Sequence, residues 1–154
     1  PFPTELHDVT GQLLRERGQE FGTTTGRPRR TGWFDAVAAR YAAQLNGMTE
    51  IALTKLDILD PLDEIPVCVG YRIDGREVSV PPARLDLLAR VQPVYEVLDG
   101  WRSDTSQVTS FEELPAAARR YIERIEELVG VPVTMVGVGP ARRQILWRAA
   151  GALA

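Results

Sequence analysis

The stretch at residues 110–140, SFEELPAAARRYIERIEELVGVPVTMVGVGP, decides the fold class because a helical pattern gives way to an extended one within it. Ser110 and Glu113 have the spacing of a capping box, which predicts that a helix begins there. Apolar side chains then recur every three or four residues, as on one face of a helix, at Leu114, Ala117, Ala118, Tyr121, Ile125 and Leu128. Gly130 ends the pattern, and residues 133–136 predict a strand that leads into a glycine-rich turn.

The rest of the chain alternates in the same way. Helices are expected near the N-terminus, with Thr4 as the cap, and over residues 34–45, ended by Gly47. Asp74-Gly75 suits the type I′ turn of a hairpin between two strands. The expected strands cover residues 50–56, 67–73, 76–80, 94–98 and 145–148. Strands alternating with helices predict an α/β fold, with a mixed sheet and flanking helices.

The composition favours a compact globular domain and argues against several classes of protein. The 154 residues are 44% apolar, which is enough for one compact domain or a large piece of a bigger one. A formal net charge of −3 gives no global field for nucleic acid or an anionic membrane. The apolar stretches are too short to span a bilayer. Cys68, the single cysteine, is expected to be a small buried hydrophobe, which fits a cytoplasmic location. The chain starts at Pro1 without a methionine, which suggests a fragment.

Residues 20–32 form the first segment with functional potential. They lack an apolar period and hold three glycines, four threonines, three arginines and a proline, so a loop is expected. Glycines let a ligand approach the backbone closely, while threonine hydroxyls and arginine guanidinium groups bind carboxylate or phosphate oxygens. Such a loop suits an anionic small molecule. A solvated basic turn is the alternative, and a nucleic-acid site is disfavoured by the overall acidity and the lack of interleaved aromatic residues.

Two further segments follow predicted strands. At residues 54–57, an aspartate could accept hydrogen bonds from the Watson–Crick edge of guanine, and the stem of the neighbouring lysine could cover the base. The alternative is a pair of solvent-facing turn residues. At residues 137–140, backbone amides of the glycine-rich turn could face a base or phosphate, although a turn without a function is also compatible with this sequence.

Catalytic groups are otherwise scarce. His7, the only histidine, is expected to be structural or solvent-facing within the N-terminal helix. The chain offers neither a zinc-ligand pattern nor a nucleophile elbow. The pairs Glu112/Glu113 and Glu126/Glu127 are expected to form the solvent-exposed face of their helix. The sequence therefore supplies binding segments without an evident catalytic residue or metal ligand.

Taken in order, these segments resemble the adenylosuccinate synthetase family over nearly the whole chain. PFPTEL at residues 1–6 and EFGTTTGRPRRTGWFD at residues 20–35 are similar to the family's motifs, and the latter matches its aspartate-binding loop. TKLD at residues 54–57 and GVGP at residues 137–140 follow in the family's order. The resemblance implies the C-terminal part of a larger, P-loop-like, GTP-using enzyme that joins IMP to L-aspartate in AMP biosynthesis, with magnesium.

The resemblance also implies roles for individual residues. The loop that holds the aspartate substrate would be Thr23, Thr24, Thr25, Gly26, Arg27, Pro28 and Arg29. Arg27 would also reach IMP, and Arg29 would reach GTP. The remaining contacts with GTP would come from Lys55, Leu56, Asp57, Gly137, Val138 and Gly139. The family often has serine and threonine where Gly137 and Val138 stand, so only backbone contacts are implied there.

The family's catalytic residues and magnesium and phosphate loop belong to an N-terminal part whose glycine-lysine motif does not occur here. The resemblance therefore implies an inactive fragment of a homodimeric enzyme, with neither nucleic acid nor membrane as partner. Two alternatives remain open. One is a stand-alone guanine-nucleotide-binding or interaction module, and the other is a polyanion-binding module that acts through Arg27, Arg29 and Arg30.

Overall fold

The computed structural model describes residues 1–148. Its α-helices are α1 (Val9–Arg17), α2 (Ala36–Asn46), α3 (Leu85–Leu88) and α4 (Ala116–Val129). Its strands are β1 (Phe34–Asp35), β2 (Ile51–Leu53), β3 (Glu64–Ile73), β4 (Arg76–Val78), β5 (Gln92–Asp99), β6 (Val133–Gly137) and β7 (Ile145–Trp147). Short 3-10 turns lie at η1 (Leu56–Leu59), η2 (Phe111–Glu113) and η3 (Arg142–Gln144). No helix among these residues is long and apolar enough to cross a membrane.

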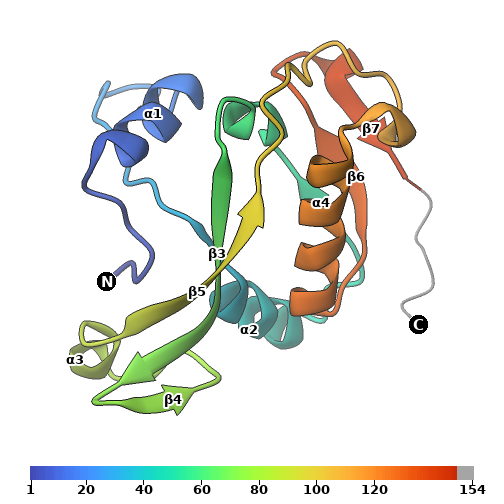
Figure 1. Ribbon diagram of the computed structural model, residues 1–154. Helices are drawn as coiled ribbons and strands as arrows, with labels where there is room; N and C mark the ends of the chain where they lie inside the picture. The colour runs from blue at the N-terminus through green and yellow to red at the C-terminus, as the bar shows by residue number, and fades with distance from the viewer. Residues whose placement is uncertain (149–154) are drawn as a thin grey trace.

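The strands divide between two mixed sheets (Figure 1). In the larger sheet, β3 pairs in parallel with β1 and antiparallel with β4 and β5. In the smaller sheet, β6 pairs in parallel with β2 and antiparallel with β7. The predicted α/β class with mixed strand directions is confirmed, and the structure adds that the strands form two sheets.

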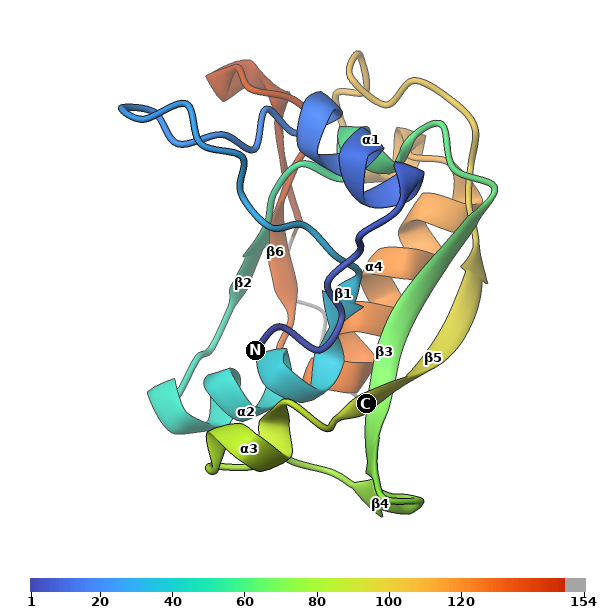
Figure 2. The same ribbon diagram turned by 90° about the vertical axis from the view of Figure 1, so that its left-hand side faces the viewer.

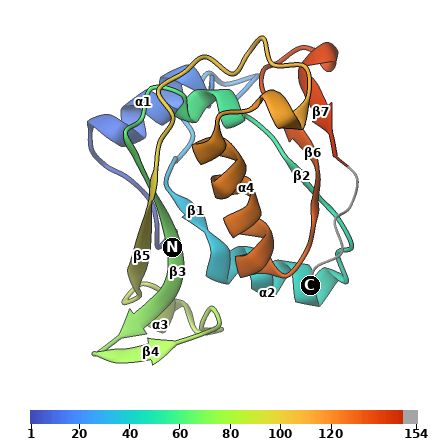
Figure 3. The ribbon, with the colours of Figure 1, turned by 45° about the vertical axis from the view of Figure 1, so that its right-hand side comes forward.

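Helix α4 lies at the centre of the core (Figure 3). It packs against α2 and contacts β5 of one sheet and β6 of the other. Ile122 and Ile125 on its inner face are completely buried, and each such side chain contributes roughly 1.5–3 kcal/mol of hydrophobic stabilisation. Of the predicted stripe, Ala118, Tyr121 and Ile125 are buried on this face, whereas Leu114 precedes the helix and Ile122 was not part of the prediction.

Both predicted N-terminal caps are wrong. Helix α1 begins after Asp8, whose carboxylate accepts from the amides of Thr10 and Gly11, each over 3.0 Å. Thr4 is instead buried, and its hydroxyl donates to the carbonyl of Trp33 over 2.8 Å. Because a proline fixes φ but lacks an amide proton, the chain enters α4 at Pro115 rather than at Ser110.

The Ser110 region forms the short turn η2 rather than the start of α4. The Glu113 carboxylate accepts from the amide and hydroxyl of Thr109, over 2.9 and 3.1 Å. Glu112 and Glu113 are exposed as predicted, although they precede the helix.

The prediction that Glu126 lies on the solvent-exposed face of α4 is wrong, since this residue is only 8% exposed. Its carboxylate accepts from the Val133 amide over 2.7 Å and from the Arg148 guanidinium over 2.6 Å. These bonds tie the helix to the open end of the β6–β7 pair, where β6 begins and β7 ends. Its neighbour Glu127 is exposed as predicted.

Several boundaries agree with the sequence pattern. Gly47 and Gly130 adopt left-handed conformations after α2 and α4. Asp74 and Gly75 both have positive φ, as a type I′ turn requires. The strand predicted over residues 50–56 is shorter, because Lys55 is left-handed at φ 61° and begins η1.

Candidate functional site

Residues 20–32 form a loop, as predicted, and its residues 23–30 are exposed and extend from the body of the molecule (Figure 2). Its tip is closed by hydrogen bonds from the Gly22 amide to the Arg27 carbonyl, over 2.8 Å, and from the Gly26 amide to the Gly22 carbonyl, over 2.7 Å. Gly26 turns the tip with φ 63°, in the left-handed region that favours glycine. The side chains of Thr23 and Thr24 at the tip are accessible to a small ligand.

Two of the three arginines in this loop are paired within the chain. Arg29 pairs with Glu20 over 3.0 Å, and Arg30 pairs with Glu5 over 3.4 Å. Arg27 is exposed near the tip. This pairing reduces the positive charge that a polyanion would meet, so the loop is not a continuous basic stripe.

Lys55 connects the first segment to the second. Its ammonium group donates to the Gly18 carbonyl over 2.6 Å and also to the Glu20 carboxylate. Because Glu20 accepts from both Lys55 and Arg29, its pKa is lowered, with the hydrogen bond from Lys55 as the largest cause. One carboxylate thus links the expected substrate loop to the expected guanine segment.

The second segment enters η1, which places its residues in different surroundings. Leu56 is 1% exposed and belongs to the core, so any ligand contact there would use its backbone. Arg17 of α1 donates to the carbonyls of Asp57 and Ile58, over 3.0 and 3.2 Å, and so anchors η1. Asp57 is only partly covered, but its Oδ1 atom is buried without a hydrogen-bond partner among residues 1–148.

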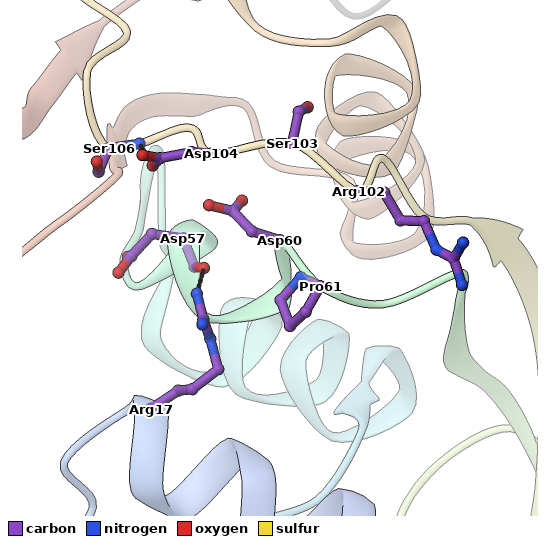
Figure 4. A pocket seen from close by; sticks show the side chains of 8 residues that line it. All are labelled: Arg17, Asp57, Asp60, Pro61, Arg102, Ser103, Asp104 and Ser106. Atoms are coloured by element: carbon purple, nitrogen blue, oxygen red, sulfur yellow. Dashed lines mark hydrogen bonds between the residues drawn. The ribbon is translucent and has the colours of Figure 1, made fainter.

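Asp57 borders an open pocket of about 590 Å³ (Figure 4). Asp57 and Asp60 project from η1 and its end, and the residues of the chain at 102–106 form the opposite wall. The lining residues are Arg17, Asp57, Asp60, Pro61, Arg102, Ser103, Asp104 and Ser106. Most of these lining residues are charged or polar, although the pocket also exposes apolar surface, and its dimensions suit a ring with hydrogen-bonding edges.

The pKa of Asp57 is raised, first by desolvation and further by the negative charge of Asp60. A backbone hydrogen bond and the charges of Arg17 and Lys55 act in the opposite direction. The Oδ1 atom itself is buried without a hydrogen-bond partner among residues 1–148, which is unfavourable for a carboxylate oxygen.

The third segment lies beside the second. Strands β2 and β6 pair up to Leu53 and Val136, so Gly137 stands against Thr54, where a side chain would come within 3.4 Å of the Thr54 Cα atom. The Val138 amide already donates to the Gln144 carbonyl over 2.9 Å, so it does not face a ligand as the turn pattern suggested.

Gln144 covers the last glycine of that turn. A Cβ atom on Gly139 would lie 2.4 Å from the Gln144 side-chain amide, so any side chain there would displace Gln144. The Gln144 amide group also accepts from the Ala141 amide over 3.0 Å and donates to the Ser106 carbonyl over 2.9 Å. The turn is thereby joined to one wall of the pocket. Of the predicted guanine-contacting residues, only Asp57 lines the pocket directly.

Sequence reasoning missed several residues that build this region: Arg17, Glu20, Asp60, Ser106 and Gln144. Asp60 follows Asp57 by one 3-10 turn and precedes a proline, and Glu20 is the first residue of the glycine-rich loop. Those positions were the available signals. Their partners, however, lie 35 or more residues away in the sequence.

Other reactive side chains show no catalytic arrangement. His7 is exposed and precedes α1 rather than lying within it. Cys68 is buried, as predicted, and burial followed by the charge of Asp35 raises its pKa to about 12. Among residues 1–148, no group of three or more histidine, cysteine, aspartate or glutamate side chains could hold a metal ion.

Comparisons with known proteins agree on one family. The family model described as adenylosuccinate synthetase matches residues 1–146. The chain is 75% identical over 153 residues to the adenylosuccinate synthetase of Thermomicrobium roseum, a match that covers 99% of this chain and 36% of that protein. It is 56% identical over 147 residues to that of Acidothermus cellulolyticus, covering 95% and 34%.

A solved structure has the same fold. The fully ligated adenylosuccinate synthetase of Plasmodium falciparum superposes with a TM-score of 0.93 at 40% identity, over 97% of this chain and 36% of that one. The chain thus spans roughly a third of the length of the relatives it matches. With this agreement in sequence and in structure, the chain belongs to the adenylosuccinate synthetase family.

Proposed function

We propose that this chain is the part of an adenylosuccinate synthetase that holds the aspartate loop and the guanine pocket, in an enzyme that ligates IMP and L-aspartate with GTP. The observation that carries the proposal is Asp57, which borders the 590 Å³ pocket and has a buried Oδ1 atom without a hydrogen-bond partner among residues 1–148. Guanine presents two N–H donors on one edge, whereas adenine presents an acceptor and a donor there. A single carboxylate can therefore select guanine.

The energetics favour such selection. A charge-assisted hydrogen bond is worth roughly 1.5–3 kcal/mol, and the Asp57 oxygen is desolvated before the ligand arrives. Adenine would leave this oxygen without a donor or bring an acceptor against it, which is unfavourable. Lys55 and the turn at residues 137–139 lie at the adjoining strand ends and would border the same nucleotide.

For the exposed loop we assign L-aspartate to the amides and hydroxyls around Thr23, Thr24 and Thr25. Arg27 is directed to the acidic groups of IMP and aspartate, because a guanidinium pairs bidentately with carboxylate and phosphate. Arg29 is assigned to GTP, which requires that it exchange its Glu20 partner for a phosphate. These three assignments are supported by the exposure of the loop and by the family match.

Among residues 1–148, no group of three or more histidine, cysteine, aspartate or glutamate side chains could hold a metal ion. The ligands for magnesium, the general base and the dimer contacts are assigned to the remaining two thirds of the enzyme. The isolated chain should consequently bind nucleotide without turning it over, and cytoplasmic location is part of the same proposal.

The test is calorimetric titration of the chain with GDP and with ADP, for the wild type and for Asp57→Asn. We expect GDP binding to the wild type, at least about tenfold weaker binding to the variant from the loss of one charged acceptor, and little binding of ADP. Asp86→Asn is the matched control, because Asp86 is an exposed aspartate in α3, at the other end of the molecule.

Equal affinities for GDP and ADP would contradict the guanine assignment. The assignment of the chain to the enzyme has its own test, in which the corresponding 153 residues of the Thermomicrobium roseum synthetase are replaced by this chain. The hybrid should form adenylosuccinate, and Arg27→Gln should abolish its activity. Synthetase activity of this chain alone would contradict the claim that it lacks the catalytic part.

A further inference from the structure

We infer that Asp60 is a positioning residue for guanine recognition, because it holds the wall of the pocket that faces Asp57. This inference rests on the proposed guanine site and adds a residue that does not itself contact the base. Its observations are three hydrogen bonds that converge on one buried carboxylate.

The wall needs such an anchor. Residues 100–109, which follow β5, have no regular secondary structure, so no sheet or helix hydrogen bonds fix their path. Asp60 Oδ1 accepts from Trp101 Nε1 over 2.7 Å and from the Thr105 hydroxyl over 3.0 Å. Its Oδ2 accepts from the Thr105 amide over 2.9 Å. One carboxylate therefore holds both ends of the segment 101–105.

This anchor is well shielded from water. Asp60 is 7% exposed and Thr105 is 0% exposed, so their hydrogen bonds are not exchanged readily for bonds to solvent. Ser106 is held in addition by the Gln144 side chain, over 2.9 Å. The segment is thus fixed between η1 on one side and the β6–β7 connection on the other.

The same residue connects the wall to Asp57. The Asp60 amide donates to the Asp57 carbonyl over 3.3 Å, within one 3-10 turn. Any shift of Asp60 therefore moves the wall relative to the guanine-selecting oxygen. The distance across the pocket, and hence the orientation of the base, depends on this one side chain (Figure 4).

Asp60→Asn tests the inference with almost no change in volume. In either orientation of the new amide, an NH₂ group faces an N–H donor, either that of the Thr105 backbone or that of the Trp101 ring. We expect amide hydrogen exchange at residues 101–106 to become at least about tenfold faster, and GDP to bind about tenfold more weakly.

Nucleotide selectivity shows whether Asp60→Asn disturbs the alignment of the base or only lowers the stability of the chain. Inosine diphosphate lacks the 2-amino group of guanine, so the ratio of GDP to inosine diphosphate affinity reports the alignment of the base with Asp57. That ratio should fall in Asp60→Asn. A variant that is merely less stable would lose affinity for both nucleotides equally, and this outcome would overturn the inference.

Substitutions of Thr105 keep the test decisive if Asp60→Asn does not fold. Thr105→Ser retains both donors to Asp60 and should behave as the wild type, whereas Thr105→Val loses only the hydroxyl and should show an intermediate effect. Asp86→Asn should change neither exchange nor selectivity. Unchanged loop exchange in both Asp60→Asn and Thr105→Val would overturn the inference, while a wild-type chain without guanine preference would instead refute the proposed function.

Discussion

Arg29 and Glu20 hold each other twice, through the backbone and through their side chains. The Arg29 amide donates to the Glu20 carbonyl over 2.9 Å, and its guanidinium donates to the Glu20 carboxylate over 3.0 Å. The two residues thereby close the exposed loop at its base. Lys55 joins the same carboxylate from the neighbouring strand end. Two of the cations assigned to GTP are therefore oriented by one acidic side chain before any ligand binds.

Glu20→Gln should loosen this arrangement without unfolding the chain. The neutral amide retains one acceptor but loses the charge that attracts both cations, and pairs near the surface are worth only about 0–1 kcal/mol. We expect faster hydrogen exchange across residues 22–29 and a thermal midpoint close to that of the wild type. Glu5→Gln, which affects only the pair with Arg30, is the control. Unchanged exchange in the loop would show that its backbone bonds alone fix it.

Because the pKa of Asp57 is raised, we expect the stability of the folded chain to depend on pH. The folded chain holds the Asp57 proton more tightly than the unfolded chain does, so this group lowers stability as pH rises through its folded pKa. Below the ordinary aspartate pKa, both states are protonated and the effect vanishes. Asp57→Asn should therefore raise the thermal midpoint more at pH 8 than at pH 4. An equal change at both pH values would indicate that desolvation of the carboxylate is not the cause.

Binding should follow the opposite trend, because only the ionised carboxylate accepts both guanine donors. GDP affinity should fall on acidification, beginning at a higher pH than an exposed aspartate would give. Titration calorimetry at several pH values measures this dependence. The Asp57→Asn variant should show a flatter profile over the same range.

Glu126 is expected to be a major contributor to stability although it carries charge. Glu126→Ala leaves the Val133 amide buried without its acceptor and removes the partner of Arg148, a loss of about 3 kcal/mol in unfolding free energy. Urea denaturation measures the change. Glu127→Ala, on the exposed side of the same helix, should cost less than about 1 kcal/mol. Similar losses for both variants would contradict the role of the buried bonds.

The sequence predicted those features that depend on neighbouring residues. The stripe on α4, the left-handed Gly47 and Gly130 and the Asp74-Gly75 turn follow from local backbone preferences and periodicity. The same patterns predicted that three segments lie after or between helices and strands: residues 20–32, 54–57 and 137–140. The structure brings the last two together at adjoining strand ends.

Features that depend on distant partners were not predictable in this way. Ser110 and Glu113 have capping spacing, but Pro115 and the contacts of Thr109 determine where the helix begins. Glu126 has the sequence context of a surface residue and is buried only because β6 and Arg148 approach it. In the sequence, Asp60 cannot be distinguished from other turn aspartates. Its role depends on hydrogen bonds from Trp101 and Thr105, which lie in the segment after β5.

The bonds that build the pocket join residues far apart along the chain: 35 positions separate Glu20 from Lys55, 45 separate Asp60 from Thr105, and 38 separate Ser106 from Gln144. Contacts of long sequence separation form only after the loop-closure entropy of the intervening chain has been overcome. The pocket therefore needs contacts between distant parts of the chain, whereas helix α4 forms through contacts within Ala116–Val129. A chain with helix α4 formed need not have the pocket, so helix content alone does not report whether the pocket is complete.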